Sequence, residues 1–295
     1  MLKPPGITSH DAVEYIRELL KEKKVGHTGT LDPAACGVLP ILVGKATRLA
    51  EYALQHTKSY RAEVTLGITT DTQDTTGKIL SQKSVSDISL EDIKSVLKDF
   101  KGKIKQTPPD FSAVRYQGRK LYELARKGIE VSKKSRVVYI YKLEIFKFYP
   151  KGPHPRIILD ITCSKGTYIR TLCSDIGEKL GTGAVLSFLI RTASGPFLLE
   201  EALTIEEIKE NISKDKYEFI LPMSYVVQHL PVIEVDSTAA KKIKNGVTVG
   251  VNITEHKNIK NNSLVQIVYN SSLIAVGQIL IDNYKNIVKP KKVFV

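Results

Sequence analysis

The sequence predicts an α+β protein with a small, mostly β C-terminal domain. Apolar residues recur with helical spacing in some segments, such as 168–180, and alternate with polar residues in others, such as 59–68. After about Leu230 the pattern changes to short β segments separated by Asn-Gly and Asn-Asn pairs. The length of 295 residues suits one large domain, or a large domain followed by a small one.

The first part of the chain predicts two helices separated by a shaped loop. Thr8 or Ser9 can cap the first helix. The following loop is rich in Gly and Thr, and Pro33 disfavours the helical conformation at Asp32. We expect the helices at residues 9–23 and 45–56.

A strand, a helix and an insertion are expected next. Tyr60 stands at the entrance of the alternating strand 59–68. Ser89 and Asp92 have the spacing of a capping box that opens an amphipathic helix. Segment 102–135 carries prolines and many cations, and we interpret it as an insertion that a ligand orders.

The remaining elements follow from periodicity and from turn residues. Gly181 can end the helix that begins after the turn at Ser164. The expected strands are 136–149, 156–163, 184–191, 232–235, 264–269, 273–280 and 293–295, and the expected helices are 121–126, 168–180 and 204–211.

The chain is basic, and its excess charge is clustered. It has 44 Lys and Arg against 31 Asp and Glu, a net charge of +13. Residues 98–136 hold 12 basic and 4 acidic side chains, and residues 229–295 hold 9 and 4, which accounts for the whole excess. Such clusters suit a polyanion-binding surface. A generally basic soluble protein is an equal alternative on charge alone, and an acidic membrane surface is a weaker one.

Several classes of protein are disfavoured by composition. No stretch approaches the ~20 apolar residues that span a bilayer, and the first residues do not resemble a signal peptide. Three cysteines without CxxC spacing are too few for a disulfide framework or a zinc site. We therefore expect a cytoplasmic protein that requires no metal and no cofactor.

The candidate catalytic residues are unremarkable when each is taken alone. Asp32, in a Gly/Thr loop, would usually be a turn former. Tyr60 would usually be an aromatic residue at the edge of the core, and Arg170 a surface cation.

Taken together, five ordered motifs resemble the TruB family of tRNA pseudouridine synthases. The loop from Gly26 to Pro40, with Leu31-Asp32-Pro33 at its centre, closely resembles the catalytic loop of that family. Relatives that modify ribosomal RNA typically have Arg before Leu-Asp, whereas Thr30 favours the TruB branch. The other motifs are Lys3-Pro4-Pro5-Gly6, Lys58-Ser59-Tyr60-Arg61, Pro109 to Gly118, and Ser164-Lys165-Gly166-Thr167-Tyr168-Ile169-Arg170.

The resemblance covers essentially the whole chain and implies its architecture. The catalytic domain is expected at residues 1–225, with a central mixed, mainly antiparallel sheet flanked by helices and an RNA-gripping insertion at about 102–135. Residues 229–295 resemble a PUA domain, a small RNA-binding β-barrel. One departure is that the family usually has a short apolar strand before the Lys-Pro motif, and this chain begins almost at that motif.

The resemblance also implies roles for individual residues. Asp32 is the reacting carboxylate, which either attacks the ribose C1′ or assists through a glycal intermediate. Arg170 lies against it, Tyr60 stacks on the target base, and Tyr168 lines the pocket. Leu189 resembles an apolar wall of the site, and plain core is nearly as good an interpretation. The substrate-binding residues implied are His27, which takes the space of the flipped base, and Lys3, Pro4, Arg115, Tyr116 and Arg126.

The implied substrate is the T-loop uridine at position 55 of tRNA, bound through the T arm and elbow. We expect a monomer with no obligatory protein partner. Two alternatives stay open: a dyskerin-like synthase aimed by a guide RNA, and a non-catalytic chaperone of tRNA folding.

Overall fold

The computed structural model describes residues 1–129, 131–252, 259–282 and 285–294. Its chain divides into two compact units. Both take segments from the N-terminal part of the chain, so the boundary expected near residue 225 falls inside the second unit. The first unit comprises residues 1–12, 29–40 and 55–205, and the second comprises 13–28, 41–54 and 206–295.

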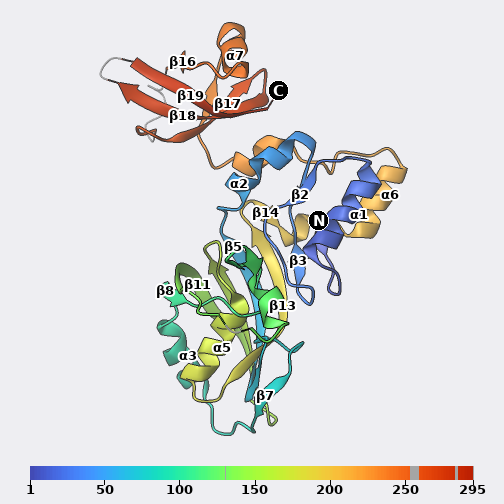
Figure 1. The fold of residues 1–295 in the computed structure, drawn as a ribbon, viewed down its shortest axis with the longest axis vertical. Helices are drawn as coiled ribbons and strands as arrows, with labels where there is room; N and C mark the ends of the chain where they lie inside the picture. The colour runs from blue at the N-terminus through green and yellow to red at the C-terminus, as the bar shows by residue number, and fades with distance from the viewer. Residues whose placement is uncertain (130, 253–258, 283–284, 295) are drawn as a thin grey trace. The chain divides into compact units, whose positions relative to one another are not determined.

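The first unit is built on an eight-stranded mixed sheet (Figure 1). Neighbouring strands pair antiparallel except β3 and β13, which are parallel. This confirms the expected mixed, mainly antiparallel sheet. In spatial order the strands are β1 (Leu2–Lys3), β3 (Cys36–Val38), β13 (Ala184–Ser194), β5 (Lys58–Leu66), β12 (Arg156–Cys163), β11 (Arg136–Tyr149) and β8 (Gly102–Gln106), with β14 (Phe197–Leu198) paired to β13.

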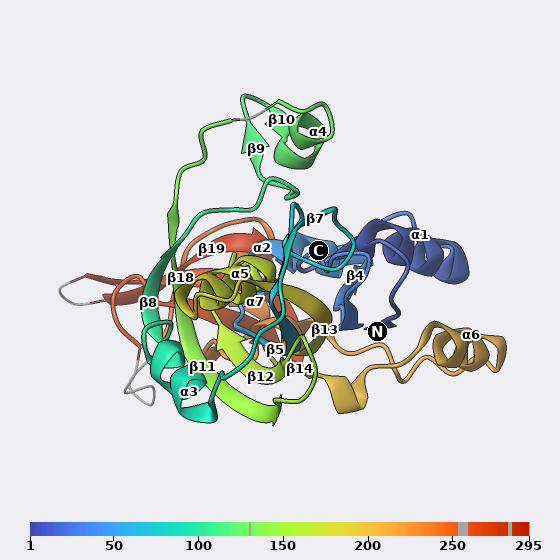
Figure 2. The ribbon, with the colours of Figure 1, turned by 90° about the horizontal axis from the view of Figure 1, so that it is seen from below.

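The basic insertion leaves the sheet later than expected. Its first residues form the edge strand β8, which pairs with β11. The part outside the sheet begins at Thr107, and Figure 2 shows it standing away from the sheet. It contains β9 (Arg115–Tyr116), β10 (Arg119–Lys120) and α4 (Leu121–Ala125). A separate hairpin joins β6 (Ile68–Thr70) and β7 (Ile79–Gln82), and η2 (Leu199–Glu201) follows β14.

The helices near the N-terminus are shorter than expected. Thr8 caps α1 (Ser9–Leu20) by a reciprocal pair of hydrogen bonds with Asp11. The helix ends at Leu20 and not near residue 23, because Lys21 takes a left-handed backbone with φ of 50°. The expected helix at 45–56 is a 3₁₀ helix, η1 (Gly44–Leu49), followed by the single turn α2 (Ala50–Ala53).

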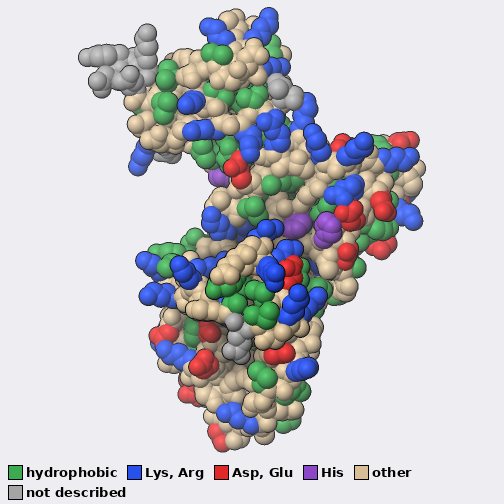
Figure 3. Space-filling model, in the orientation of Figure 1, with side chains coloured by type: hydrophobic (Ala, Val, Ile, Leu, Met, Phe, Trp, Pro, Cys, Tyr) green, Lys and Arg blue, Asp and Glu red, His purple; other side chains and the backbone are tan. Residues whose placement is uncertain are grey.

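The second unit contains a separate five-stranded sheet at the C-terminal end of the chain. It curls into a half-barrel, and among the described residues its end strands β15 and β16 are not paired with each other. Figure 3 shows Lys and Arg side chains scattered over this part of the molecule. The strands are β15 (Val232–Glu234), β17 (Leu264–Tyr269), β18 (Ser272–Asp282), β19 (Lys285–Val293) and β16 (Val249–Gly250).

Further elements complete the second unit. The basic helix α7 (Ser237–Lys244), capped by Asp236, was not expected from the sequence. Of the strand expected at 293–295, Val293 is the last residue of β19 and Phe294 lies outside a strand, whereas Val295 is not among the described residues. The others are β2 (Val25–His27) paired with β4 (Ile41–Val43), α6 (Ile205–Ser213) and η3 (Met223–Val227). No helix in the described ranges is long and apolar enough to cross a membrane.

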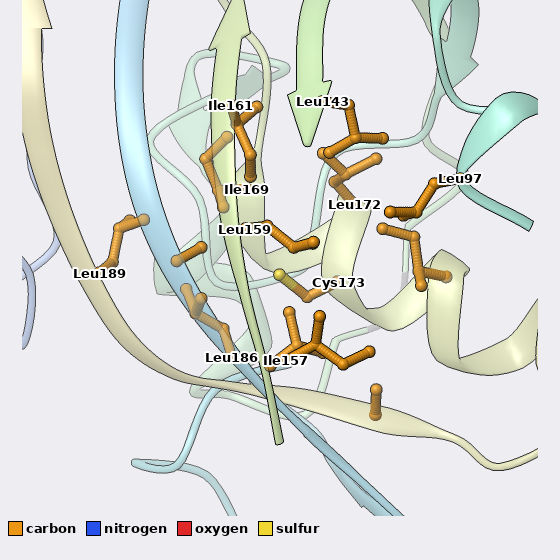
Figure 4. Close-up of a cluster of buried hydrophobic side chains, with 14 of the residues drawn as sticks. Leu97, Leu143, Ile157, Leu159, Ile161, Ile169, Leu172, Cys173, Leu186 and Leu189 are labelled. Carbon is orange, nitrogen blue, oxygen red and sulfur yellow. The ribbon is translucent and has the colours of Figure 1, made fainter. Parts of the chain in front are cut away.

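One face of the eight-stranded sheet carries the main hydrophobic core. Strand β5 turns Ala62, Val64 and Leu66 to this face, as its alternation predicted. Helices α3 (Leu90–Lys98) and α5 (Ile169–Lys179) cover it, and Figure 4 shows the α5 side chains meeting those of the strands. Ser89 and Asp92 form the expected capping box at the start of α3.

The contact between α5 and β13 requires a glycine at position 177. A Cβ there would lie 2.3 Å from both the backbone nitrogen and the Cβ of Ala184. We therefore expect Gly177→Ala to lower the free energy of unfolding by about 1–3 kcal/mol, since α5 must move away from the strand. Urea denaturation measures this. Gly250→Ala is the matched control, because a Cβ at Gly250 has no neighbour within 4 Å; equal losses in both variants would contradict the prediction.

Candidate active site

Asp32 lies in a loop that is fixed on both sides of it. The Oγ of Ser9 donates to the Leu31 carbonyl at 3.0 Å and accepts from the Leu31 N–H at 2.8 Å. On the other side, the Gly6 N–H donates to the Pro33 carbonyl at 2.9 Å. These bonds hold the backbone of the loop while 42% of the Asp32 side chain stays exposed. A partly exposed carboxylate on a fixed backbone can meet a substrate.

A buried lysine reinforces the same loop. Lys3 is fully buried, and its Nζ donates to the carbonyls of Pro4 at 2.8 Å, Pro33 at 3.3 Å and Ala35 at 2.8 Å. Burial lowers the pKa of Lys3. Expected as a substrate-binding residue, Lys3 has no exposed surface in this structure, and Pro4 is half-buried.

Arg191 binds both ends of the loop through its buried guanidinium. This residue of β13 is 1% exposed, and its Nε donates to the Val38 carbonyl at 2.6 Å while Nη2 donates to the Gly29 carbonyl at 3.1 Å. Sequence analysis did not single it out. In the sequence, Arg191 directly follows the mostly apolar strand residues 184–190, which is the signal that could have found it. The structure shows that this arginine is buried with them.

Arg170 is paired with Asp32, as the resemblance implied. The Arg170 side chain is only 6% exposed, and its Nε lies 2.9 Å from Oδ2 of Asp32. This contact is an ion pair without a hydrogen bond, because the Nε–H does not point at that oxygen. Nη2 donates to Oδ1 of Asp32 at 3.3 Å. A buried guanidinium thus orients one carboxylate, with its remaining surface open.

Arg170 also joins two other segments to the site. Its Nη1 donates to the Thr72 carbonyl at 2.9 Å, and its Nη2 donates to the Phe111 carbonyl at 2.9 Å. A second carboxylate, Asp74, has its Oδ2 3.7 Å from Nη1. The other oxygen of Asp74 accepts from the Thr76 N–H at 2.9 Å. Sequence analysis missed Asp74, since an aspartate among threonines has the signature of a turn.

Tyr60 and Leu189 lie at the edge of the hydrophobic core. Tyr60 is half-buried and packs against the core cluster that contains Leu189, which is 7% exposed. Burial raises the pKa of Tyr60, and the positive charge of Arg191 opposes that effect. The environment favours a neutral phenol held in a fixed orientation.

Tyr168 is positioned by a buried amide. The Gln106 Nε2 donates to the Tyr168 carbonyl at 2.9 Å, and its Oε1 accepts from the Tyr168 N–H at 2.7 Å. The guanidinium of Arg136 lies 4.9 Å from the centre of the Tyr168 ring. Its Nη2 is buried and has no hydrogen-bond partner within the described part of the chain.

The expected RNA-binding residues are spread over both units. Arg115, Tyr116 and Arg126 belong to the part of the insertion outside the sheet, and all three are exposed. The guanidinium of Arg126 lies 5.5 Å from the centre of the Tyr122 ring. His27 ends strand β2 in the second unit.

Family models match most of the chain. Residues 17–169 match the N-terminal domain of the TruB family pseudouridylate synthases. Residues 170–228 match the C-terminal domain described for tRNA pseudouridylate synthase B.

Individual relatives agree with these matches. The chain is 50% identical to tRNA pseudouridine synthase B of Moorella thermoacetica over 84% of its own length and 82% of the relative. It is 42% identical to the protein of that name from Heliobacterium modesticaldum, over 100% of this chain and 94% of the relative. Among solved structures, a Cbf5-Nop10-Gar1 complex matches with a TM-score of 0.75 and 30% identity, over 100% of this chain and 83% of that one.

The buried lysine beneath the loop yields a test of stability. We expect Lys3→Met to lower the free energy of unfolding by about 2 kcal/mol, because buried carbonyls lose their donor. Lys101→Met, at an exposed position in the same unit, should leave it unchanged. Urea denaturation of both variants measures the difference, and equal stability would show that Lys3 does not hold the loop.

Proposed function

The chain belongs to the TruB family of pseudouridylate synthases, and from this premise we infer that it isomerises the T-loop uridine at position 55 of tRNA, with Asp32 as the reacting carboxylate. It is a tRNA pseudouridine synthase, an isomerase, like relatives that are 50% identical to it. We propose, in addition, that the uridine at position 55 is the one modified, and we propose the roles of the individual residues.

The observation that carries the assignment of Asp32 is its pairing with a buried Arg170. The reaction breaks the bond between ribose C1′ and N1 of uracil, and joins C1′ to C5. It therefore needs a group that attacks or stabilises an electron-poor sugar carbon, as carboxylates do in glycosidases. Asp32 offers such a carboxylate, which is 42% exposed beside a guanidinium that is 6% exposed. Arg170 keeps it oriented.

The reaction is balanced without an oxidant or a reductant. Asp32 either adds to C1′ and is displaced by C5, or assists departure of the base through a glycal. The detached base turns over, C5 bonds to C1′, and the proton on C5 is lost as another is gained at nitrogen. Tyr60 supports the base by stacking of its ring, which is half-buried at the edge of the core. We propose that its hydroxyl also helps to relay the C5 proton.

Recognition of the RNA must compensate for extracting the base. Flipping a base costs a few kcal/mol. We propose that His27 occupies the vacated space and that Arg115, Tyr116 and Arg126 grip the T arm. The C-terminal half-barrel adds phosphate contacts through lysines of α7 and β19. Lys3 acts through the loop that it holds, and Tyr168 and Leu189 wall the pocket.

We propose that the protein acts on free tRNA in the cytoplasm, as a monomer and without a guide RNA. Solved neighbours at 28–30% identity come from complexes with other proteins or with RNA. Relatives named for tRNA are closer in sequence, at 41–50% identity. The basic insertion offers a recognition surface of the chain's own, which argues against delegation to a guide.

Tritium release from C5-labelled uridine tests the proposal directly. The purified protein is added to an unmodified tRNA transcript, and the control transcript has cytidine in place of the T-loop uridine. Release that requires this uridine supports both the reaction and the site. Absence of release by a folded protein that binds tRNA would favour the guide-dependent or chaperone alternatives.

Replacement of the reacting carboxylate should stop the chemistry. We expect Asp32→Asn to abolish tritium release and to leave tRNA binding largely intact, because the amide is a far weaker nucleophile of similar shape. Asp87→Asn is the matched control: Asp87 is exposed, and its φ of 64° suits asparagine equally well. Turnover by the Asp32→Asn variant would exclude the proposed mechanism.

The second carboxylate at Arg170 should matter for rate. We expect Asp74→Asn to lower kcat by about 10- to 100-fold, because a shift of about 1 Å in a catalytic group costs that much. Asp71→Asn changes the same loop at a residue whose carboxylate accepts from the Lys78 N–H, and should retain its rate. Single-turnover tritium release compares them, and a normal rate in the Asp74→Asn variant would show that Arg170 needs one carboxylate only.

A further inference from the structure

Between β5 and β12, polar pairs cover the face of the eight-stranded sheet opposite the helices. Arg61 donates twice to Asp160, from Nε at 2.7 Å and from Nη2 at 2.9 Å. Its guanidinium also lies 3.6 Å from the centre of the Phe146 ring. The Ser59 and Thr162 hydroxyls share a hydrogen bond of 3.0 Å. These side chains satisfy one another, so this part of the face needs no partner.

The edge of the same face, on β11, is different. Val137, Tyr139 and Tyr141 are 52%, 44% and 59% exposed, on the face opposite Val138 and Ile140, which are buried. The two tyrosine rings stack on each other, with centroids 5.9 Å apart and planes inclined by 20°. The protein therefore presents a preformed aromatic surface to solvent. Exposed aromatic groups on a sheet are a common platform for unpaired bases.

Two lysines of the edge strand β8 lie beside this surface, at Tyr139 and at Val137. Lys103 pairs in register with Tyr139, and Lys105 pairs with Val137, so their side chains share this face. Both are exposed, and neither has an ion-pair partner among the residues that the structure describes. Figure 3 shows Lys and Arg side chains beside hydrophobic ones where Figure 1 places β8 and β11.

Lys142 is paired with Glu144 at 3.1 Å. Lys105 also borders a cavity that Asp71, Asp110 and Asp175 help to line. Lys103 is thus the cation committed most clearly to the open face.

This aromatic edge is connected to the active site. The Ser164 Oγ accepts from the Tyr139 N–H at 2.9 Å, and the Ser164 N–H donates to the Tyr139 carbonyl at 2.8 Å. Ser164 begins the turn that leads to Tyr168 and Arg170. The aromatic edge therefore lies at the end of the strands from which the active site is built, and on the opposite face of the sheet.

We propose that Tyr139, Tyr141, Lys103 and Lys105 form a second RNA-binding surface, on which an unpaired nucleotide of tRNA outside the T arm stacks while the lysines contact its phosphates. The proposal rests on tRNA as the substrate and is independent of the role of Asp32. The charge favours a polyanion over a protein partner: two unpaired lysines border the rings, in a stretch of 12 basic and 4 acidic residues at 98–136.

The absence of tryptophan from the sequence allows a direct test by fluorescence. In the Tyr141→Trp variant, stacking of a base on the new indole should quench its emission when full-length tRNA is added. An isolated T-arm hairpin should not quench it. The matched control is Phe146→Trp, at an exposed aromatic position of the same strand and face that is flanked by Arg61 and Asp160. The proposal would be overturned if full-length tRNA quenched both variants equally. It would also be overturned if the isolated T-arm hairpin quenched the Tyr141→Trp variant.

Binding and turnover provide the second arm of the test. The double variant Tyr139→Ala/Tyr141→Ala should raise the Kd of full-length tRNA by about 10- to 100-fold, since one stacked base is lost. Its Kd for the T-arm hairpin and its tritium release from the hairpin should equal those of the unaltered protein. Unchanged affinity for full-length tRNA would overturn the proposal, including the case in which the surface binds a protein. If the unaltered protein released no tritium from the hairpin, that result would instead count against the proposed function.

The lysines are tested by salt dependence. For Lys103→Gln/Lys105→Gln, the slope of log Kd against log salt for full-length tRNA should fall by about one to two, because each phosphate contact releases roughly one counterion. The slope for the hairpin should stay the same. An equal change for both RNAs would show that the lysines add general charge only, and would overturn their assignment to this surface.

Discussion

The active site depends on one buried guanidinium, which joins three separate segments of the first unit to the start of α5. Arg170 meets Asp32 from the catalytic loop, Thr72 and Asp74 from the loop between β6 and β7, and Phe111 at the base of the insertion. A charge that is 6% exposed must be compensated by such partners. The same desolvation that makes the pair costly to break fixes the geometry that a nucleophile requires. Each of these loops is therefore positioned by its contact with Arg170, at the start of α5.

The catalytic loop itself is held by cations that bond to backbone carbonyls. Lys3 donates to two carbonyls of the loop, those of Pro33 and Ala35, and Arg191 donates to two more, at Gly29 and Val38. Had these cations been paired with carboxylates, the loop would need further acidic residues close to Asp32. Carbonyl acceptors satisfy the buried donors of Lys3 and Arg191, so Asp32 stays available for Arg170 and for the substrate.

Local pattern predicted local structure, and long-range polar contacts escaped it. The alternation of β5, the period of α5 and the Ser89–Asp92 capping box were confirmed, because each depends on residues adjacent in sequence. The resemblance pointed to the Asp32–Arg170 pair. Asp74 and Arg191 were missed because their partners lie 96 and more than 150 residues away in the chain. The end of α1 was predicted too late in the sequence, because a lysine and not a glycine takes the left-handed backbone at position 21.

The two faces of the sheet are linked by an irregularity in β11. Strict alternation would place Ile140 and Leu143 on opposite faces, yet both are buried in the same core. The register shift between Ile140 and Lys142 resolves this by inserting an extra residue, so that Tyr141 and Lys142 are both exposed. The strand that supplies Arg136 to the side of Tyr168 thereby presents tyrosines on its other side. A change that removed the bulge would move Leu143 out of the core, so the aromatic edge is maintained by the same packing that supports the site.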